Sequence, residues 1–178
     1  MPRKARLDAP GTLHHVIIRG IERRPIVDDE KDRENFVSRL GQLAVETETG
    51  IFAWTLMTNH AHILVKSGSF GLPNFMRRLL TGYAITYNLR HRRHGHLFQN
   101  RYKSIVCEED PYCKESVRYI HLNSIRANMV QAIKDLDRYR WSGHSAIVGK
   151  VDYAWMDCDY VLRCFGGTVR GARISYRE

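Results

Sequence analysis

Residues 51–66 read IFAWTLMTNHAHILVK, two short apolar runs separated by a Thr-Asn pair. Both runs are rich in residues that favour strands, and the Thr-Asn pair suits the tight connection of a hairpin. We therefore expect two strands, over residues 51–57 and 61–66, that pair with each other. The second strand begins beside His60 and carries His62, so this stretch holds candidate functional side chains as well as part of the fold.

The flanking sequence predicts the other elements of an α+β fold. Residues 12–19 (TLHHVIIR) are apolar and β-branched, which is typical of a strand, while Pro73 and Pro111 suit the first turns of two helices. We expect strands over 12–19 and 97–107, and helices over 28–48, 72–91 and 110–127. This order predicts a ferredoxin-like split β-α-β plan, an antiparallel sheet with helices on one face, plus an added C-terminal helix.

The charge of the chain is uneven. Its formal net charge is +9, yet no Asp or Glu occurs between Glu48 and Glu108. A patch of one sign is typical of a surface that binds a polyanion, and nucleic acid is the leading candidate. A solvated face would mix both signs, and the cations are spread over more elements than one membrane-surface helix. The cations of this stretch are Lys66, Arg77, Arg78, Arg90, Arg92, Arg93, Arg101 and Lys103.

Composition narrows the class of protein. Hydrophobic residues make up 43% of the 178, enough for a folded core, and no apolar run approaches the roughly 20 residues of a membrane span. The basic N-terminus has no apolar stretch behind it, so we expect a cytoplasmic protein without a signal peptide. Four cysteines stand in two pairs whose spacing is wide for structural zinc, which favours reduced thiols.

His60 and His62 stand two residues apart on a predicted strand, so both imidazoles point to the same face. Such a pair is half of a metal site, although a pair of surface histidines in a hairpin is the simpler alternative. His94 and His96 form a rival pair. They flank Gly95 in a strongly positive turn that would repel a cation.

Tyr119 and Asn123 stand four apart on the last predicted helix and share one face, with Arg126 on the same side. Two neutral imidazoles and one amide would leave a divalent cation its full charge, and the cation would polarise a phosphate. The tyrosine oxygen could then attack phosphorus and form a covalent phosphotyrosine. An ordinary half-buried core tyrosine is the alternative.

A second basic cluster, over residues 90–103, mixes cations with aromatic side chains. The cations suit phosphates, while Phe98 and Tyr102 could stack on bases. Phe98 is also compatible with a core position, because alternate residues of a strand face inward.

Four motifs in this order resemble the single-tyrosine HUH transposases, above all the REP-associated tyrosine transposases of bacteria. The resemblance covers most of residues 12–141. Two departures stand out, since the family often has Asn where this chain has Ile21-Glu22, and Pro where it has Ser124. The motifs are HHVIIRG (14–20), MTNHAHILV (57–65), GHLFQNRYKS (95–104) and YIHLNSIRANMV (119–130).

The resemblance implies hairpin-directed cleavage and rejoining of single-stranded DNA through a 5′-phosphotyrosine. Tyr119 would be the nucleophile, and His60, His62 and Asn123 would hold Mg²⁺ or Mn²⁺. Some relatives continue past the point that corresponds to Glu178, which suggests either a truncated chain or a short variant. From the resemblance and the basic clusters together, the expected DNA contacts are Arg19, Arg90, Arg92, Arg93, Arg101, Lys103 and Arg126.

The resemblance also implies a catalytic domain over residues 1–130 and a C-terminal extension over 131–178 packed on the same domain, working as a monomer or a homodimer. Three other functions stay open at this point. A domesticated relative would grip hairpin DNA without cutting it. A ferredoxin-like RNA-binding module would stack bases on aromatic side chains but would leave the histidines and Tyr119 unexplained. A hydrolytic nuclease would cut without a covalent adduct.

Overall fold

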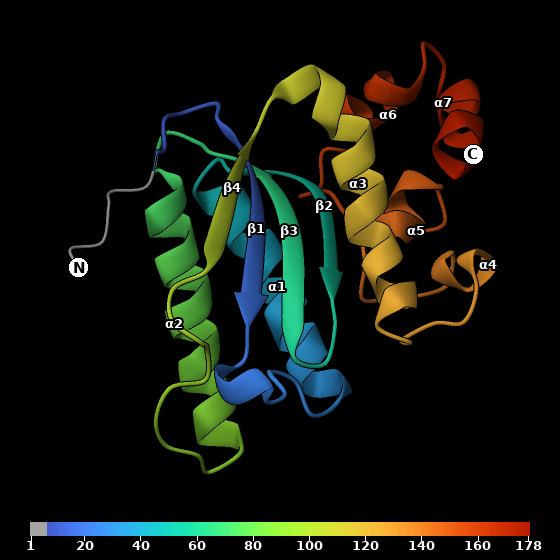
Figure 1. The fold of residues 1–178 in the computed structure, drawn as a ribbon. Coiled ribbons are helices and arrows are strands. Elements are labelled where there is room, and N and C mark those ends of the chain that lie inside the picture. The colour runs from blue at the N-terminus through green and yellow to red at the C-terminus, as the bar shows by residue number, and fades with distance from the viewer. Residues whose placement is uncertain (1–6) are drawn as a thin grey trace.

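The structure is a computed structural model, and it describes residues 7–178 apart from the side chains of residues 109–111. A four-stranded sheet lies at its centre (Figure 1). The elements that build and cover the sheet are β1 (Leu13–Arg19), a short 3-10 helix η1 (Ile21–Arg23), α1 (Glu30–Glu46), β2 (Gly50–Leu56), β3 (His60–Lys66), α2 (Leu72–Arg90), β4 (Lys103–Cys107) and α3 (Glu109–Arg126). Four shorter helices follow: α4 (Ile133–Leu136), α5 (His144–Ile147), α6 (Cys158–Phe165) and α7 (Val169–Arg177).

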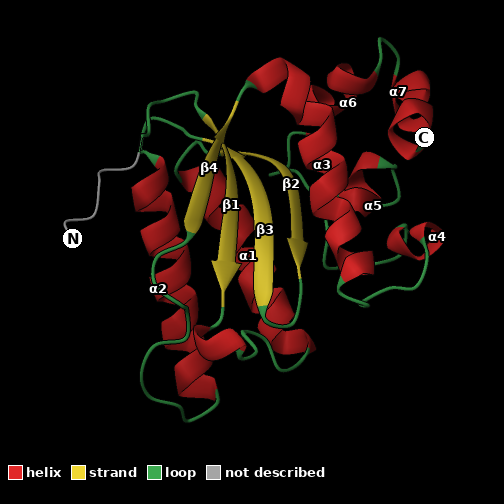
Figure 2. Ribbon diagram, viewed as in Figure 1, coloured by secondary structure: helices red, strands yellow, loops and turns green. Residues whose placement is uncertain are grey.

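The strands run in the order β2-β3-β1-β4, and every neighbouring pair is antiparallel. This arrangement confirms the predicted α+β fold with a split β-α-β sheet. Figure 2 shows α1 and α2 behind and beside the sheet, with α3 on its other side near β2. The two crossover helices therefore share one face as expected, and the added helix α3 packs on the opposite face.

Local sequence explains where α1 and α2 begin. The side chain of Asp29 accepts a hydrogen bond from the backbone N–H of Asp32 at 3.0 Å, which caps α1. Phe36 and Leu40 then recur at helical spacing and are fully buried against the sheet. Gly71 precedes α2 with a φ of +80°, a conformation that glycine adopts without strain.

The fourth strand is shorter than the sequence predicts. It begins at Lys103, whereas residues 97–102 are irregular and meet the backbone after β1 at an isolated bridge between Phe98 and Gly20. Asn100 explains the difference, since its φ of +53° is a left-handed conformation that interrupts an extended strand. The last predicted helix also begins earlier than expected, at Glu109.

The chain after residue 130 packs along the free edge of β2. The backbone N–H of Leu56 donates to the carbonyl of Trp141 at 2.8 Å, and the N–H of Gly143 donates to the carbonyl of Trp54 at 2.8 Å. The helices α6 and α7 lie against α3 and against each other. The division of the chain near residue 130 into a domain and an extension stays a prediction.

Two further expectations concern cysteines and membranes. The thiol of Cys164 on α6 donates to the sulfur of Cys113 on α3 at 3.2 Å. Within residues 7–178, no helix is both long and apolar enough to cross a bilayer.

Candidate active site

The strand β3 presents His60 and His62 on the sheet face that α3 covers. Their ring centroids lie 5.3 Å apart, while Ala61 between them is buried on the opposite face. His62 pairs in register with Thr55 of β2, and the Thr55 hydroxyl bonds the Ser124 hydroxyl of α3 at 2.6 Å. This buried contact fixes α3 over the two histidines.

Each of these histidines uses only its Nδ1 atom in a hydrogen bond. His60 Nδ1 lies 2.7 Å from the amide oxygen of Asn59, so it carries the proton and donates. His62 Nδ1 lies 2.9 Å from Nε2 of His15 on β1. Both Nε2 atoms are left for another partner, and a neighbour bonded to the other ring nitrogen is the usual device that orients a metal-binding histidine.

His15 is a member of this cluster that the sequence alone did not single out. It is buried beside His62, with a ring-centroid distance of 5.1 Å. The motif HHVIIRG contained it, but only the register of β1 against β3 brings it to the site.

Burial keeps the imidazoles uncharged. It lowers the pKa of His62 to about 3, helped by the nearby charges of His15, His60 and Arg19. Burial and the charge of Lys103 lower the pKa of His15 to about 4. Burial and Arg19 also lower the pKa of His60. A metal ion binds the neutral imidazole, so these shifts favour ligation at neutral pH.

Tyr119 projects from α3 beside the histidines. Its ring centroid lies 5.8 Å from that of His15 and 6.1 Å from that of His62, and 44% of the residue is exposed. The guanidinium of Arg126 sits 4.8 Å from the centre of the tyrosine ring. Tyr119 is therefore accessible to a large substrate and has a cation beside it, whereas an ordinary core tyrosine would be buried.

Asn123 lies one helical turn after Tyr119 and is buried. Its Nδ2 donates to the Tyr119 carbonyl at 2.8 Å, which leaves Oδ1 as the atom that can bind a cation. The neighbouring Ser124 contacts Thr55, the strand partner of His62. The structure thus gathers His60, His62, Tyr119 and Asn123 on one face, as the sequence predicts.

Of the predicted DNA contacts, Arg19, Lys103 and Arg126 surround this face. Arg19 pairs in register with His60 and lines a hollow of about 220 Å³ together with it, and Lys103 pairs with Ile17 beside His62. All three are exposed cations, placed to meet phosphates near the histidines.

The remaining predicted contacts lie elsewhere. Arg90 makes ion pairs of 2.6 Å with both Asp29 and Asp32, so its charge is largely compensated within the protein. Arg93 bonds Asn88 and the carbonyl of His96. Arg92 is exposed in the turn after α2, and Arg101 faces a groove along α2.

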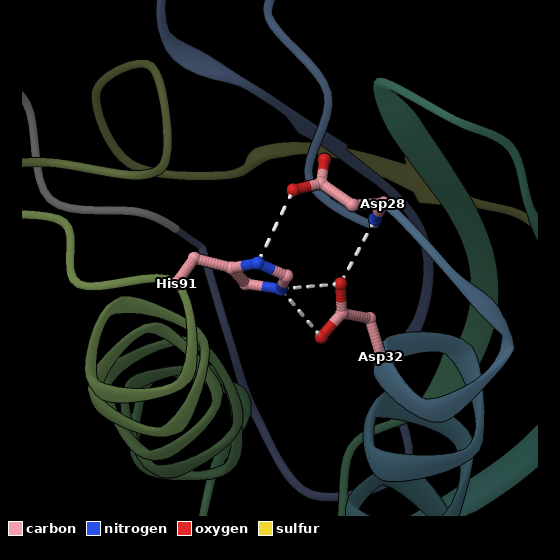
Figure 3. A group of neighbouring side chains, drawn as sticks. All are labelled: Asp28, Asp32 and His91. Carbon is pink, nitrogen blue, oxygen red and sulfur yellow. Dashed lines mark hydrogen bonds and ion pairs between the residues drawn. The ribbon is translucent and has the colours of Figure 1, made fainter.

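Figure 3 shows a second group of metal-binding residue types, formed by Asp28, Asp32 and His91. Their candidate ligand atoms lie within 4.8 Å of one another. His91 Nε2 contacts both carboxylate oxygens of Asp32, at 2.8 and 3.0 Å, and Arg90 and the backbone N–H of Asp28 also donate to Asp32. These contacts already satisfy the cluster, which joins the start of α1 to the end of α2. The rival pair His94 and His96 is exposed.

Comparisons with known proteins place this geometry in a family. Residues 11–123 match the family model described as transposase IS200 like. A solved structure of a REP-associated tyrosine transposase bound to a REP hairpin has the same fold, with a TM-score of 0.67 at 12% identity, over 88% of this chain and 98% of that one.

A structure from Deinococcus radiodurans R1, described as a transposase, matches at 18% identity over 76% of this chain and 98% of that one, with a TM-score of 0.46. The search of curated proteins found no match. The family match spans β1, both candidate metal-ligand histidines, Tyr119 and Asn123, which is well over half of the chain. The chain belongs to the family of IS200-like transposases.

Proposed function

We propose that this protein cuts and rejoins single-stranded DNA next to a hairpin, with Tyr119 as the nucleophile. The observation that carries the proposal is the position of Tyr119, an exposed tyrosine whose ring lies 6.1 Å from that of His62 on the face with two unused imidazole nitrogens. Membership of a transposase family and a fold shared with a hairpin-bound transposase support it.

The donor set fits a divalent cation. His60 and His62 would offer their Nε2 atoms and Asn123 its Oδ1 atom, all uncharged, while the Nδ1 partners Asn59 and His15 hold the rings in place. Mg²⁺ or Mn²⁺ bound there would act as a Lewis acid on a phosphate oxygen and help to orient the phosphate.

In the cutting step, the Tyr119 oxygen forms a bond to phosphorus while the bond to the 3′ oxygen of the preceding nucleotide breaks. The phenol proton is lost, and the leaving 3′ oxygen takes up a proton. Rejoining reverses these changes, because a 3′ hydroxyl attacks the phosphotyrosine and Tyr119 is released. The exposed Arg19, Lys103 and Arg126 hold the phosphates on either side. The number of phosphodiester and phosphotyrosine bonds is conserved, so no ATP is needed.

A denaturing gel with hairpin-containing single-stranded DNA and Mn²⁺ or Mg²⁺ tests the proposal. We expect a band in which protein and DNA migrate together, absent with chelator and absent in Tyr119→Phe. Tyr112→Phe is the matched control, since Tyr112 is an exposed tyrosine on the same helix, and it should leave the band intact.

Two results would overturn the assignment. Cleavage that survives Tyr119→Phe without an adduct would mean hydrolysis by water. Tight hairpin binding with no cleavage and no adduct in any metal would mean a domesticated binding protein.

A further inference from the structure

Two of the four cysteines lie side by side although they come from different parts of the chain. The sulfur atoms of Cys113 on α3 and Cys164 on α6 are 3.2 Å apart, and the two residues are 51 positions apart in the sequence. A disulfide bond needs about 2.05 Å between its sulfur atoms, so a movement of about 1 Å would bring the pair to bonding distance. Small side-chain movements would therefore be enough to let a bond form between the two helices.

The packing around the sulfur pair holds α6 against α3. Lys114 and Arg118 of α3 both lie over the ring of Phe165, with the ammonium nitrogen 5.8 Å and the guanidinium carbon 5.0 Å from its centre. Phe165 directly follows Cys164, and Lys114 directly follows Cys113. These cation–π contacts therefore hold in place the residues next to both sulfurs.

The two thiols differ in their access to solvent. Cys113 is fully buried, whereas Cys164 is partly exposed. An oxidant from solution therefore reaches Cys164 more easily, and the sulfur of Cys113 lies in contact with the atom that it would oxidise. An accessible thiol beside a second thiol that can displace the oxidised group is the usual arrangement of redox-responsive cysteines.

The remaining two cysteines offer matched controls. Cys158 lies on α6 like Cys164 and is also partly exposed. Burial and then the charges of nearby aspartates raise the pKa of Cys158 to about 11, so its thiol stays protonated and reacts slowly at neutral pH. Cys107 donates a hydrogen bond to the carbonyl of Ile105 at 3.5 Å.

From these observations we propose that Cys113 and Cys164 form a reversible disulfide when hydrogen peroxide reaches the protein, and that this bond fastens α3 to α6. The Cys164 sulfur attacks the peroxide, the O–O bond breaks, and Cys164 becomes a sulfenic acid while water leaves. The Cys113 sulfur then forms the S–S bond, and the sulfenic oxygen leaves as a second water. The two thiols lose two electrons and two protons, and the peroxide takes up both. A dithiol reverses the step by exchange.

The bond would stabilise the helix that carries Tyr119. It closes a loop of the chain that contains Tyr119 and Asn123, and a crosslink limits the unfolded chain more when the loop is longer. Oxidation should therefore raise the urea concentration at the unfolding midpoint by about 1–2 M. In a reducing environment the pair stays as two thiols. The proposal does not depend on the cutting chemistry, since neither cysteine takes part in it.

Mass spectrometry of the full chain tests the proposal. The protein is treated with hydrogen peroxide, the remaining thiols are alkylated, and the chain is cleaved with trypsin and a protease that cuts after glutamate. Glu108 then separates Cys107 from Cys113, and Arg163 separates Cys158 from Cys164. We expect two peptides joined through Cys113 and Cys164. The joined peptides should be absent after dithiothreitol and in Cys164→Ser, and present in Cys158→Ser.

Urea unfolding of the reduced and oxidised protein gives the second readout. The rise in midpoint should occur in the unchanged protein and in Cys158→Ser, and should be lost in Cys164→Ser. A bond that involves Cys107 or Cys158 would overturn the proposal, as would a bond formed only between two chains. Oxidation of Cys164 to a sulfinic acid without a bond to Cys113 would also overturn it. Joined peptides with an unchanged or lower midpoint would contradict the stabilisation of α3.

Discussion

Two groups of metal-binding residue types, His60 with His62 and His91 with Asp28 and Asp32, differ in how many of their ligand atoms already form hydrogen bonds. Around His60 and His62, no carboxylate among the described residues forms a hydrogen bond to either ring, and each Nε2 is unused. Around His91, by contrast, Asp32 accepts bonds from the imidazole, from Arg90 and from the backbone N–H of Asp28. The first cluster is open to a ligand, and the second is closed on itself.

Residue type and proximity therefore do not by themselves define a metal site. A cation at the Asp28–Asp32–His91 group would have to displace Arg90 and the proton of His91. At the other cluster it would displace nothing that the described residues supply. The Asp28–Asp32–His91 group instead holds the start of α1 against the end of α2. We expect mutations to distinguish this structural group from the His60–His62 cluster.

The largest expected effect is on chemistry. His62→Ala should reduce formation of the Tyr119 adduct about 100-fold or more, because loss of a ligand removes several kcal/mol of charge stabilisation. His91→Ala should change the rate less than about threefold. Single-turnover gels with Mn²⁺ measure both. Equal losses in the two variants would break the distinction between an open and a closed cluster.

The next effect is on stability and should have the opposite ranking. Asp32→Asn should lower the free energy of unfolding by roughly 2–3 kcal/mol, since this buried carboxylate accepts from His91 and from the Asp28 amide. His62→Ala should cost less than about 1 kcal/mol, because the His62 ring has only one hydrogen bond. Urea unfolding followed by circular dichroism measures the difference. A more costly His62→Ala would mean that the open cluster is structural.

Sequence patterns were enough to predict the parts of the site that depend on local geometry. His60 and His62 share a face because a strand alternates, and Tyr119 and Asn123 share a face because a helix turns every 3.6 residues. The order of elements likewise predicted the split β-α-β sheet. What each of these side chains does in catalysis stays a prediction.

Features that depend on long-range packing were not accessible from the sequence. His15 reaches His62 through the register between two strands, 47 residues apart in the chain. Arg90 was expected to contact DNA, but it meets Asp29 from 61 residues earlier. The strand β4 begins only at Lys103 because Asn100 before it has a φ of +53°, and the sequence pattern does not indicate this left-handed residue.

His121 and His144 form another buried histidine pair, which lies around Tyr176 of α7. Tyr176 Oη lies 2.7 Å from Nδ1 of both His121 and His144, and His144 Nε2 donates to Asp137. The hydroxyl therefore donates to His144 and accepts from His121, whose Nε2 is buried without a partner. Burial, and then the charge of His144, lower the pKa of His121 well below its usual range, while Asp137 partly offsets the effect of burial on His144.

The sign of the pH effect follows from these shifts. The folded pKa of His121 lies below its unfolded value of about 6.5, so the unfolded state binds the proton first and stability falls as pH drops below 6.5. By pH 5.5 the loss from this one residue is at most about 1.4 kcal/mol. His121→Gln should remove that part of the pH dependence, and His144→Gln should remove less, in urea unfolding at pH 7 and pH 5.5. A larger effect at His144 would contradict the compensation by Asp137.

The smallest expected effect concerns the contact that holds the nucleophile helix over the open cluster. Thr55 and Ser124 are fully buried and share a hydrogen bond of 2.6 Å, and Thr55 is the strand partner of His62. Ser124→Ala should cost about 1 kcal/mol, because it leaves the Thr55 hydroxyl with only a long contact to the sulfur of Met57. Adding Thr55→Val should cost less than its single-variant value, since both polar groups are then gone. Adduct formation by Ser124→Ala should fall only a few-fold, as the other packing of α3 on β2 and β3 is kept. Strict additivity in a double-mutant cycle of unfolding free energies would show that this hydrogen bond does not couple the helix to the strand.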